Sequence, residues 1–342
     1  MAPADAGLAL RAAGRLALPR GGVELTRLGM GCAPIGGLHR PLADGEARAV
    51  IDAAWDLGVR YFDSAPYYGF TRSELRLGAA MRARPREQVV ISTKAGRLMR
   101  LDNSIGPGGG GWPDPLPFRP QYDYSYDGIR RSHDDSVRRM GIDGVDILMV
   151  HDIDLSTHGK LQQHHWKQLT RNGGFRALQA LRDEGRVRAI GIAASECQVV
   201  AAAMRECALD CTLLSGRYTL LEQSALSPLL DACVRQRNAV IIGDPFHGGI
   251  LEREDRLADA PAGVRLRAAA VAEVCREFGV PLAAAALQFP MAHAAVVSTV
   301  PGAHDVDQLR ENIAWFELPI PPELWQVLKE RGLLDARAPV DT

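Results

Sequence analysis

Three apolar, β-branched runs of this sequence each end on a titratable side chain, namely Asp63, Lys94 and His151. Five residues after Asp63 stands Tyr68, within the sequence Asp-Ser-Ala-Pro-Tyr-Tyr-Gly. Tyrosine has an ordinary pKa of about 10, so it transfers protons near neutral pH only when a cation lies close by. Lys94 is the candidate cation, with Asp63 to keep it charged and His151 to orient a substrate oxygen. Such a centre moves a proton on or off an oxygen while hydride leaves or reaches the attached carbon.

Each of these residues also has an ordinary structural interpretation. Asp63 would serve as a helix cap, Lys94 as a solvated strand end, and His151 as a buried imidazole with its hydrogen bonds satisfied. If each residue had only a structural role, it would be by chance that Asp63, Tyr68, Lys94 and His151 all stand at or near the ends of neighbouring strands. The joint pattern therefore favours a catalytic site.

Eight strand-like runs alternate with eight helix-like runs along the chain. The predicted strands cover residues 25–31, 59–63, 89–93, 146–150, 189–192, 211–214, 239–242 and 296–299. The predicted helices cover residues 44–57, 71–83, 126–140, 174–184, 198–207, 224–237, 265–291 and 306–316. Thr71 with Glu74 predicts a capping box, and Asp305 predicts an N-cap. Strict alternation predicts parallel strands with right-handed crossovers, and eight repeats favour a closed (β/α)8 TIM barrel.

An open, doubly wound sheet is the alternative fold. Its dinucleotide fingerprint requires Gly-x-Gly-x-x-Gly after the first strand, but the sequence from 29 to 37 has Pro34 where the third glycine should stand. No Pro/Ser-rich linker divides the chain, so residues 1–342 are expected to form a single barrel domain. In a barrel, the ends of the three strands that carry Asp63, Lys94 and His151 converge on one face.

A glycine-rich stretch of about thirty residues, 97–125, follows Lys94. Long loops in compact domains commonly cover binding sites, so a lid on the C-terminal face is expected. An unordered insert is the alternative. Trp112 in this stretch and Tyr67 next to the catalytic tyrosine are expected to contact the substrate.

The composition narrows the classes of function. Hydrophobic residues make up 46% of the 342 positions and the net charge is −1, so neither nucleic acid nor an anionic membrane is an expected partner. Six cysteines without a Cys-x-x-Cys pair are typical of a reduced, cytoplasmic protein. Residues 1–22 are expected to be a loose tail, with a small strand pair as the alternative.

Three histidines near two aspartates raise the question of a metal site. His158, His164 and His165 follow Asp152 and Asp154 closely, but their spacing matches no standard ligand pattern. We therefore expect no metal, and we expect these histidines to lie on a polar surface loop.

The chain resembles the aldo-keto reductase family over nearly its whole length. The family's Asp-x-Ala-x-x-Tyr-Gly motif, its lysine and its histidine match residues 63–69, Lys94 and His151. The resemblance implies a (β/α)8 barrel that binds NAD(P) across its C-terminal face without a metal. It also implies that Tyr68 is the general acid/base, tuned by Lys94 and Asp63, while His151 orients the substrate. Residues 116–118, 122–127, 151–154 and 216–222 resemble the branch of bacterial aldose 1-dehydrogenases and pyridoxal 4-dehydrogenases.

The resemblance also implies positions for the cofactor. Tyr218 corresponds to the ring that stacks on nicotinamide, while Phe246 and Gly248 lie in the loop beside the pyrophosphate. Gly302 marks the adenosine-phosphate end. The adenine-facing residues implied by the resemblance are Gln308 and Asn312.

Two departures from the family pattern bear on the cofactor. Ser195 replaces the asparagine that reads the carboxamide. His304 and Asp305 replace an Arg-Ser pair near the ribose 2′ position, and a carboxylate there disfavours a 2′-phosphate. NAD is therefore expected rather than NADP, although NADP stays open.

The expected activity is oxidation of the anomeric hydroxyl of an aldose, or of a similar cyclic hemiacetal, to a lactone. The same machinery run in reverse would make an NADPH-dependent reductase of small aldehydes or ketones. An alternative of another class is a nicotinamide-binding, redox-sensing barrel. The expected partner is a small sugar or aldehyde, and the oligomeric state is left open.

Overall fold

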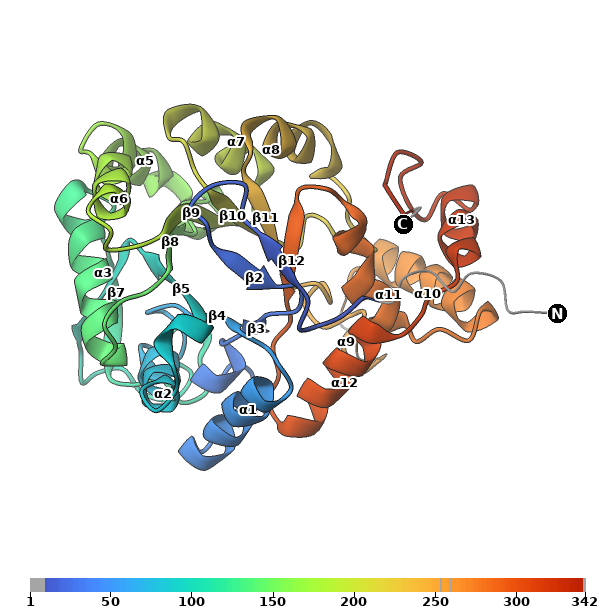
Figure 1. The fold of residues 1–342 in the computed structure, drawn as a ribbon, viewed down its shortest axis with the longest axis horizontal. Coiled ribbons are helices and arrows are strands. Elements are labelled where there is room, and N and C mark those ends of the chain that lie inside the picture. The colour runs from blue at the N-terminus through green and yellow to red at the C-terminus, as the bar shows by residue number, and fades with distance from the viewer. Residues whose placement is uncertain (1–9, 253, 259, 341–342) are drawn as a thin grey trace.

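Eight parallel strands form the barrel in the computed structural model, which describes residues 10–252, 254–258 and 260–340 (Figure 1). The strands are β3 (Met30–Gly31), β4 (Tyr61–Asp63), β5 (Val90–Ala95), β8 (Ile147–His151), β9 (Ala189–Ala194), β10 (Cys211–Ser215), β11 (Ala239–Gly243) and β12 (Val296–Val300). They are adjacent in this order. Backbone N–H groups of Gly29 and Gly31 donate to the carbonyls of Thr299 and Pro301, each at 2.9 Å, which joins β12 to β3 and closes the ring. The predicted TIM barrel is confirmed.

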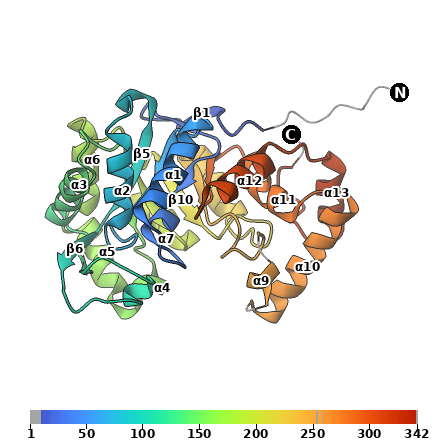
Figure 2. The same cartoon turned by 90° about the horizontal axis from the view of Figure 1, so that it is seen from below.

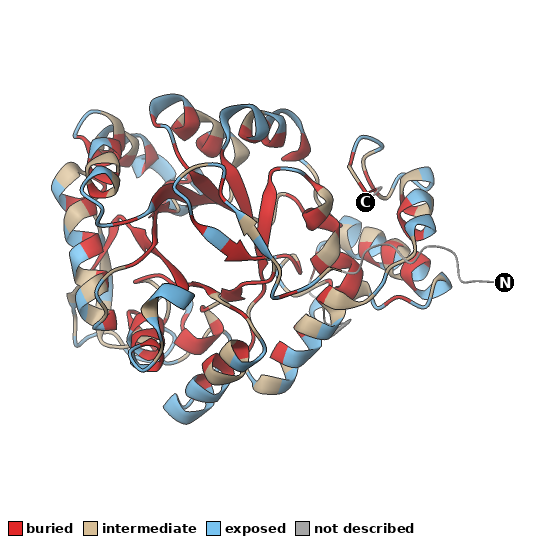
Figure 3. Cartoon of the chain, in the orientation of Figure 1, coloured by how far each residue is buried: buried red, intermediate tan, exposed pale blue. Residues whose placement is uncertain are grey.

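Helices surround the strands on the outside (Figure 1). They are α1 (Asp44–Asp56), α2 (Arg72–Met81), α3 (Tyr126–Met140), α4 (Leu155–His158), α5 (Gln162–Thr170), α6 (Gly174–Asp183), α7 (Cys197–Glu206), α8 (Asp231–Gln236), α9 (Glu254–Leu257), α10 (Ala262–Glu277), α11 (Leu282–Gln288), α12 (Val306–Glu317) and α13 (Pro322–Glu330). Burial is concentrated in the strands and on the helix faces turned toward them (Figure 3). The fold is therefore stabilised mainly by an apolar layer between the sheet and the helices.

The predicted first strand, 25–31, is wrong as a single element. It divides into β2 (Glu24–Thr26) and β3, and β2 pairs antiparallel with β1 (Arg15–Ala17). Leu25 is fully buried in the barrel interior, and the Thr26 hydroxyl accepts a hydrogen bond from the backbone N–H of Tyr61 at 3.2 Å. The β1–β2 pair therefore covers the N-terminal end of the barrel, opposite the end that carries β6, α4 and α9 (Figure 2).

The expectation that residues 1–22 form a loose tail is also wrong in part. Residues 15–17 form a strand, which is the strand-pair alternative, while residues 1–9 lie outside the described part of the chain.

Several predicted helices differ from the observed ones. The predicted helix 265–291 is divided into α10 and α11, because Gly279 adopts a positive φ of 66° and Pro281 cannot continue a helix. The capping box at Thr71 is wrong, since Thr71 has a φ of 83° and makes no side-chain cap. Instead, Glu74 is buried and accepts hydrogen bonds from the Thr93 hydroxyl at 2.7 Å and from Arg139 at 2.6 Å. The predicted N-cap at Asp305 is confirmed, because its carboxylate accepts the N–H of Gln308 at 2.8 Å.

The stretch 97–125 is ordered as a hairpin rather than as an unordered insert. Strand β6 (Arg97–Leu101) pairs antiparallel with β7 (Phe118–Tyr122). Gly96 turns the chain out of the barrel with a φ of 104°, and a Cβ there would lie only 2.1 Å from Tyr124. The hairpin therefore begins directly beside Lys94, on the C-terminal face. Whether it opens and closes as a lid stays a prediction.

Candidate active site

A cavity of about 540 Å³ lies at the C-terminal ends of the barrel strands. The sequence-predicted residues that line it are Asp63, Tyr67, Tyr68, Lys94, Trp112, His151, Phe246, Gly248, Gly302, His304 and Gln308. Strands β4, β5 and β8 deliver Asp63, Lys94 and His151 to it, as the convergence of barrel strands predicts. The structure therefore brings the four predicted catalytic residues together.

A buried ion pair forms the floor of this cavity. The Lys94 Nζ lies 2.6 Å from Asp63 Oδ2 and donates to the Ser64 carbonyl at 2.8 Å. The second carboxylate oxygen, Asp63 Oδ1, accepts from the Ser92 hydroxyl at 2.6 Å. Burial alone would lower the pKa of Lys94, but Asp63 and Tyr68 outweigh burial and raise the pKa above its ordinary value. Lys94 is therefore a permanent cation in the site.

Tyr68 lies next to this cation. The Lys94 Nζ is 4.7 Å from the centroid of the Tyr68 ring. Burial in the cleft raises the pKa of Tyr68, Lys94 lowers it in part, and Asp63 adds to the rise. Lys94 thus favours the phenolate, as expected of a nearby cation, but burial outweighs Lys94 and the net shift of the Tyr68 pKa is upward. The phenol is protonated at neutral pH in the free protein.

His151 is a neutral imidazole. Burial, then the positive charges of Arg97 and Lys94, lowers the pKa of His151 well below its usual range. Its ring centroid lies 6.1 Å from that of Tyr68, with the ring planes at 83°. One nitrogen, Nε2, is 3.4 Å from Asp152 Oδ2, while the buried Nδ1 has no partner among residues 10–340 as described. A neutral imidazole can donate one N–H to a substrate oxygen without competing for its proton.

Aromatic side chains cover the cavity next to Tyr68. Trp112, which is only 4% exposed, lies 5.9 Å from the Tyr67 ring and 6.1 Å from the Tyr68 ring, between centroids. The Tyr67 hydroxyl donates to the Gly110 carbonyl at 2.9 Å, which fixes the β6–β7 hairpin on this side. Tyr67 and Trp112 therefore line the cavity beside Tyr68, and their contact with a substrate stays a prediction.

Two charged residues near Tyr68 escaped prediction from the sequence. Arg97 is 4% exposed, and its Nη2 lies 2.5 Å from the Asp152 carboxylate, which lines the cavity. The available signal was their position, since Arg97 follows Lys94 by three residues and Asp152 follows His151 directly.

Three of the predicted cofactor residues do not line the cavity. Tyr218 is fully buried and packs against Phe289, with 5.0 Å between ring centroids. Asn312 is buried and donates to the Gly302 carbonyl at 3.1 Å, so it supports the cavity wall from behind. The structure gives neither residue a surface that could touch nicotinamide or adenine.

Ser195 is the third of these residues. Its backbone N–H and its hydroxyl both donate to Asp154 Oδ2, at 3.0 and 3.4 Å. Burial raises the pKa of Asp154 to about 6. The hydroxyl is therefore directed toward a carboxylate rather than toward the cavity.

The other end of the cavity fits an extended dinucleotide. Small residues are part of its lining, namely Gly31, Ala193, Ala194, Gly243 and Gly302. A Cβ on Gly302 would lie 2.5 Å from Pro34 Cγ, so a side chain there would push the wall inward. Two polar side chains also line the cavity, where Gln308 Nε2 donates to Glu252 Oε1 at 2.6 Å. Because the cavity is lined by Tyr68, by Gln308 and by residues with little or no side chain, it suits a nicotinamide cofactor that runs from Tyr68 to Gln308.

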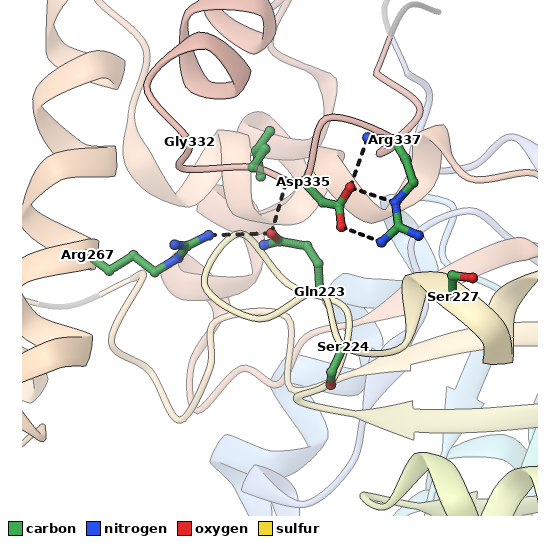
Figure 4. A pocket seen from close by; sticks show the side chains of 8 residues that line it. Gln223, Ser224, Ser227, Arg267, Gly332, Asp335 and Arg337 are labelled. Carbon is green, nitrogen blue, oxygen red and sulfur yellow. Dashed lines mark hydrogen bonds and ion pairs between the residues drawn. The ribbon is translucent and has the colours of Figure 1, made fainter.

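A second cavity of about 370 Å³ has no comparable chemistry (Figure 4). Gln223 Oε1 accepts hydrogen bonds there from the Asp335 backbone and from Arg267, while Arg337 pairs with the Asp335 carboxylate. These contacts hold the C-terminal segment against the loop after β10. The residues around this cavity therefore have a structural role, and they carry no catalytic arrangement like the one around Tyr68.

The expectation of surface histidines is wrong for two of the three. His158 and His165 are 8% and 7% exposed, and their ring centroids are 4.5 Å apart. His158 Nε2 lies 3.0 Å from the Tyr124 hydroxyl, which donates to the His151 carbonyl at 2.7 Å. They therefore pack beneath the base of the hairpin. In the described ranges, no group of three or more His, Cys, Asp or Glu side chains is arranged to hold a metal ion.

Comparison with known proteins identifies the family. The model of the aldo/keto reductase family matches residues 27–331. The chain belongs to the aldo/keto reductase family. It is 44% identical over 340 residues to a pyridoxal 4-dehydrogenase from Microbacterium luteolum, which covers 95% of this chain and 99% of that protein. It is 38% identical over 324 residues to a D-threo-aldose 1-dehydrogenase from a Pseudomonas species, covering 92% and 96%.

Solved structures agree on the fold. An aldo-keto reductase from Bacillus halodurans in its holo form superimposes with a TM-score of 0.72, at 22% identity, over 95% of this chain and 97% of that one. As an aldo/keto reductase, this protein is a nicotinamide-dependent oxidoreductase, and the branch expected from its sequence is confirmed. Among the helices that the structure describes, none is long and apolar enough to cross a membrane.

Proposed function

We propose that this aldo/keto reductase oxidises the hydroxyl of a cyclic hemiacetal to a lactone, with NAD as the preferred hydride acceptor. The substrate would be an aldose, oxidised at its anomeric carbon, or an aromatic aldehyde such as pyridoxal in its ring-closed form. One observation carries this proposal, namely the junction of Tyr68, the Asp63–Lys94 ion pair and the neutral His151 at one cavity. The two dehydrogenases at 44% and 38% identity supply the substrate classes.

Tyr68 would take the proton of the reacting hydroxyl. The ammonium of Lys94 stabilises the phenolate that must form, while Asp63 keeps Lys94 in place and does not touch the substrate. His151 would donate its N–H to the same oxygen and so orient the reacting carbon for hydride transfer. The small residues that line the cavity, among them Gly31, Gly243 and Gly302, would leave room for the nicotinamide cofactor, which supplies the hydride acceptor when bound.

The proposed preference for NAD rests on the charges near the adenosine end. His304 lines the cavity, and its Nε2 lies 2.6 Å from the Leu38 carbonyl. The Asp305 carboxylate lies 3.8 Å from the Arg40 guanidinium. Because Arg40 is paired with Asp305, its positive charge is not free to bind a 2′-phosphate. Arg256, also on the cavity wall, is the cation that a 2′-phosphate would have to use instead.

A cytoplasmic location belongs to the same proposal. All six cysteines are free thiols, as expected in a reducing compartment. Cell fractionation that recovered the protein elsewhere would contradict it.

The test is a panel of aldoses, pyridoxal and simple alcohols, with NADH or NADPH formation followed at alkaline pH. We expect turnover of ring-closed hemiacetals and a higher kcat/KM with NAD than with NADP. If no NADH or NADPH forms, while open-chain aldehydes consume added NADPH in a parallel assay, the reductase alternative is favoured instead. A clear NADP preference would contradict the cofactor part alone.

A further inference from the structure

Asp152 has an unusual position on the cavity wall. It follows His151 directly, and its backbone has a φ of 41°, which non-glycine residues adopt rarely. Its N–H donates to the Ala193 carbonyl at 2.9 Å, which fixes this conformation at the end of β8. The strained turn directs the carboxylate into the cavity, where 34% of the side chain is exposed. Backbone strain of this kind is often found at functional sites.

One oxygen of this carboxylate is held, and the other is available. Oδ2 lies 2.5 Å from Arg97 Nη2 and 3.4 Å from His151 Nε2. Within the described part of the chain, Oδ1 has no hydrogen-bond partner. A carboxylate oxygen without a donor, in a cavity shielded by aromatic rings, is a strong acceptor for a ligand hydroxyl.

The Arg97 guanidinium holds the Asp152 carboxylate in place through their ion pair. The same guanidinium stacks on the Tyr67 ring at 4.3 Å from the centroid. Since Arg97 is 4% exposed and its Nε has no partner among the described residues, its charge is balanced mainly by Asp152. Arg97 therefore acts through Asp152 as a positioning residue.

The place of Asp152 relative to His151 suggests what it binds. His151 is expected to hold the reacting oxygen, and the Asp152 carboxylate is its immediate neighbour. A hydroxyl on the carbon next to the reacting carbon would therefore lie within reach of Asp152. An aldose carries such a hydroxyl at carbon 2, which is bonded directly to the anomeric carbon. In pyridoxal the phenolic hydroxyl lies one carbon farther from the reacting carbon.

We infer that Asp152, held by Arg97, accepts a hydrogen bond from a second substrate hydroxyl beside the reacting carbon and thereby selects substrates that have one. This inference rests on the proposed function and concerns the aldose class of its substrates. Simple aldehydes, alcohols and 2-deoxy sugars lack this donor. They would leave the Asp152 oxygen desolvated and unpaired, which makes the discrimination large.

The rival explanation is that Arg97 and Asp152 form a structural ion pair, which only ties the β6–β7 hairpin to β8. A structural pair would affect all substrates equally. The two explanations therefore differ in the ratio of kcat/KM between a substrate with the second hydroxyl and the same substrate without it.

The experiment compares an aldose with its 2-deoxy counterpart in the wild type, Asp152→Gly and Asp152→Asn. Glycine and asparagine both tolerate a positive φ, so neither change adds backbone strain. We expect the wild type to prefer the aldose by about 10- to 100-fold, as for hydrogen bonds to charged groups. Asp152→Gly should reduce this ratio to within about threefold of unity, mainly through the aldose, and Asp152→Asn should reduce it in part.

Asp244→Asn is the matched control. Asp244 is another aspartate on the cavity wall with a positive φ, 50°, but it accepts the Gly248 N–H at 2.7 Å in the cofactor half. Its variant should keep the wild-type ratio. Arg97→Met should lower the ratio as Asp152→Gly does, and Arg97→Lys should restore part of it.

The outcomes separate this inference from the proposed function. A wild type that oxidises aldoses but shows no preference for the 2-hydroxyl would overturn the inference alone. The same holds if Asp152→Gly, or Asp152→Asn should the glycine variant fail to fold, lowers kcat/KM for both sugars equally. Failure of the wild type to oxidise any hemiacetal would contradict the proposed function itself.

Discussion

Replacing Lys94 by methionine should remove most activity near pH 8 and restore part of it at higher pH. The ammonium lies 4.7 Å from the centre of the Tyr68 ring. At an effective dielectric constant of about 20, a cation and a phenolate at this distance attract by about 3.5 kcal/mol, or about 2.5 pKa units. Without Lys94, the pKa of Tyr68 should rise by that amount. The phenolate fraction, and with it kcat, should fall roughly 300-fold at pH 8.

The same substitution should also destabilise the fold. Asp63 would keep its buried position and its hydrogen bond from Ser92 but lose its counter-ion. Breaking a buried pair on one side costs about 3–5 kcal/mol in the free energy of unfolding. Stability loss alone could therefore explain low activity in the single variant.

The double variant Asp63→Asn/Lys94→Met removes this ambiguity. Replacing both partners leaves no buried charge, so the free energy of unfolding should return to within about 1.5 kcal/mol of the wild type. Activity at pH 8 should not return, since the ammonium is still missing. The assays are urea unfolding and a kcat–pH profile for all three proteins. Wild-type kcat in the double variant, or an unshifted profile in Lys94→Met, would refute the role given to Lys94.

Three further outcomes are expected from the same structure. Gly302→Ala, whose Cβ would meet Pro34 at 2.5 Å, should weaken NAD binding at least tenfold in calorimetric titration, and unchanged affinity would contradict the proposed cofactor path. Since burial and two cations lower the pKa of His151, its NMR signals should show no protonation between pH 8 and 6. Burial and His165 lower the pKa of His158 to about 4, so the folded state binds this proton less readily than the unfolded state. Stability should therefore be full above pH 6.5 and fall toward pH 4, and His158→Gln should reduce the loss between pH 7 and 5 by about 1 kcal/mol.

The barrel strands were predictable because most are short, uninterrupted apolar runs between turn residues. Strand β8, for example, was placed at 146–150 and spans Ile147–His151. The prediction of the first strand failed because apolar residues, Leu25 before the break and Leu28 and Met30 after it, continue through residues 25–31. Only tertiary contacts, such as the burial of Leu25 at the end of the barrel, show that the chain folds back there.

The catalytic group was predictable for a geometric reason. Residues at the ends of parallel barrel strands meet on one face, so Asp63, Lys94 and His151 needed no contact information. The net pKa of Tyr68 was not predictable, because the depth of its cleft depends on a hairpin from elsewhere in the chain. Arg97 was missed for the same reason, since a charged residue in a loop is ordinarily expected in solvent.

The cofactor half was predicted less well, because the resemblance gives a position in the chain but not the direction of a side chain. Tyr218 follows β10 as expected, yet its ring packs outward against Phe289. Ser195 likewise follows β9, yet its hydroxyl is directed toward Asp154. Bare-backbone positions such as Gly248 and Gly302 were placed correctly at the cavity, since glycine has no side chain to misdirect.

The central claim is that Tyr68 carries the proton of the reacting hydroxyl. The most direct measurement is kcat of Tyr68→Phe with a sugar that the wild type oxidises, together with the Kd for NAD. We predict a loss of at least 1000-fold in kcat, within the range of general acid–base catalysis, and a Kd within about threefold of the wild type. Retention of full turnover by Tyr68→Phe would contradict the account.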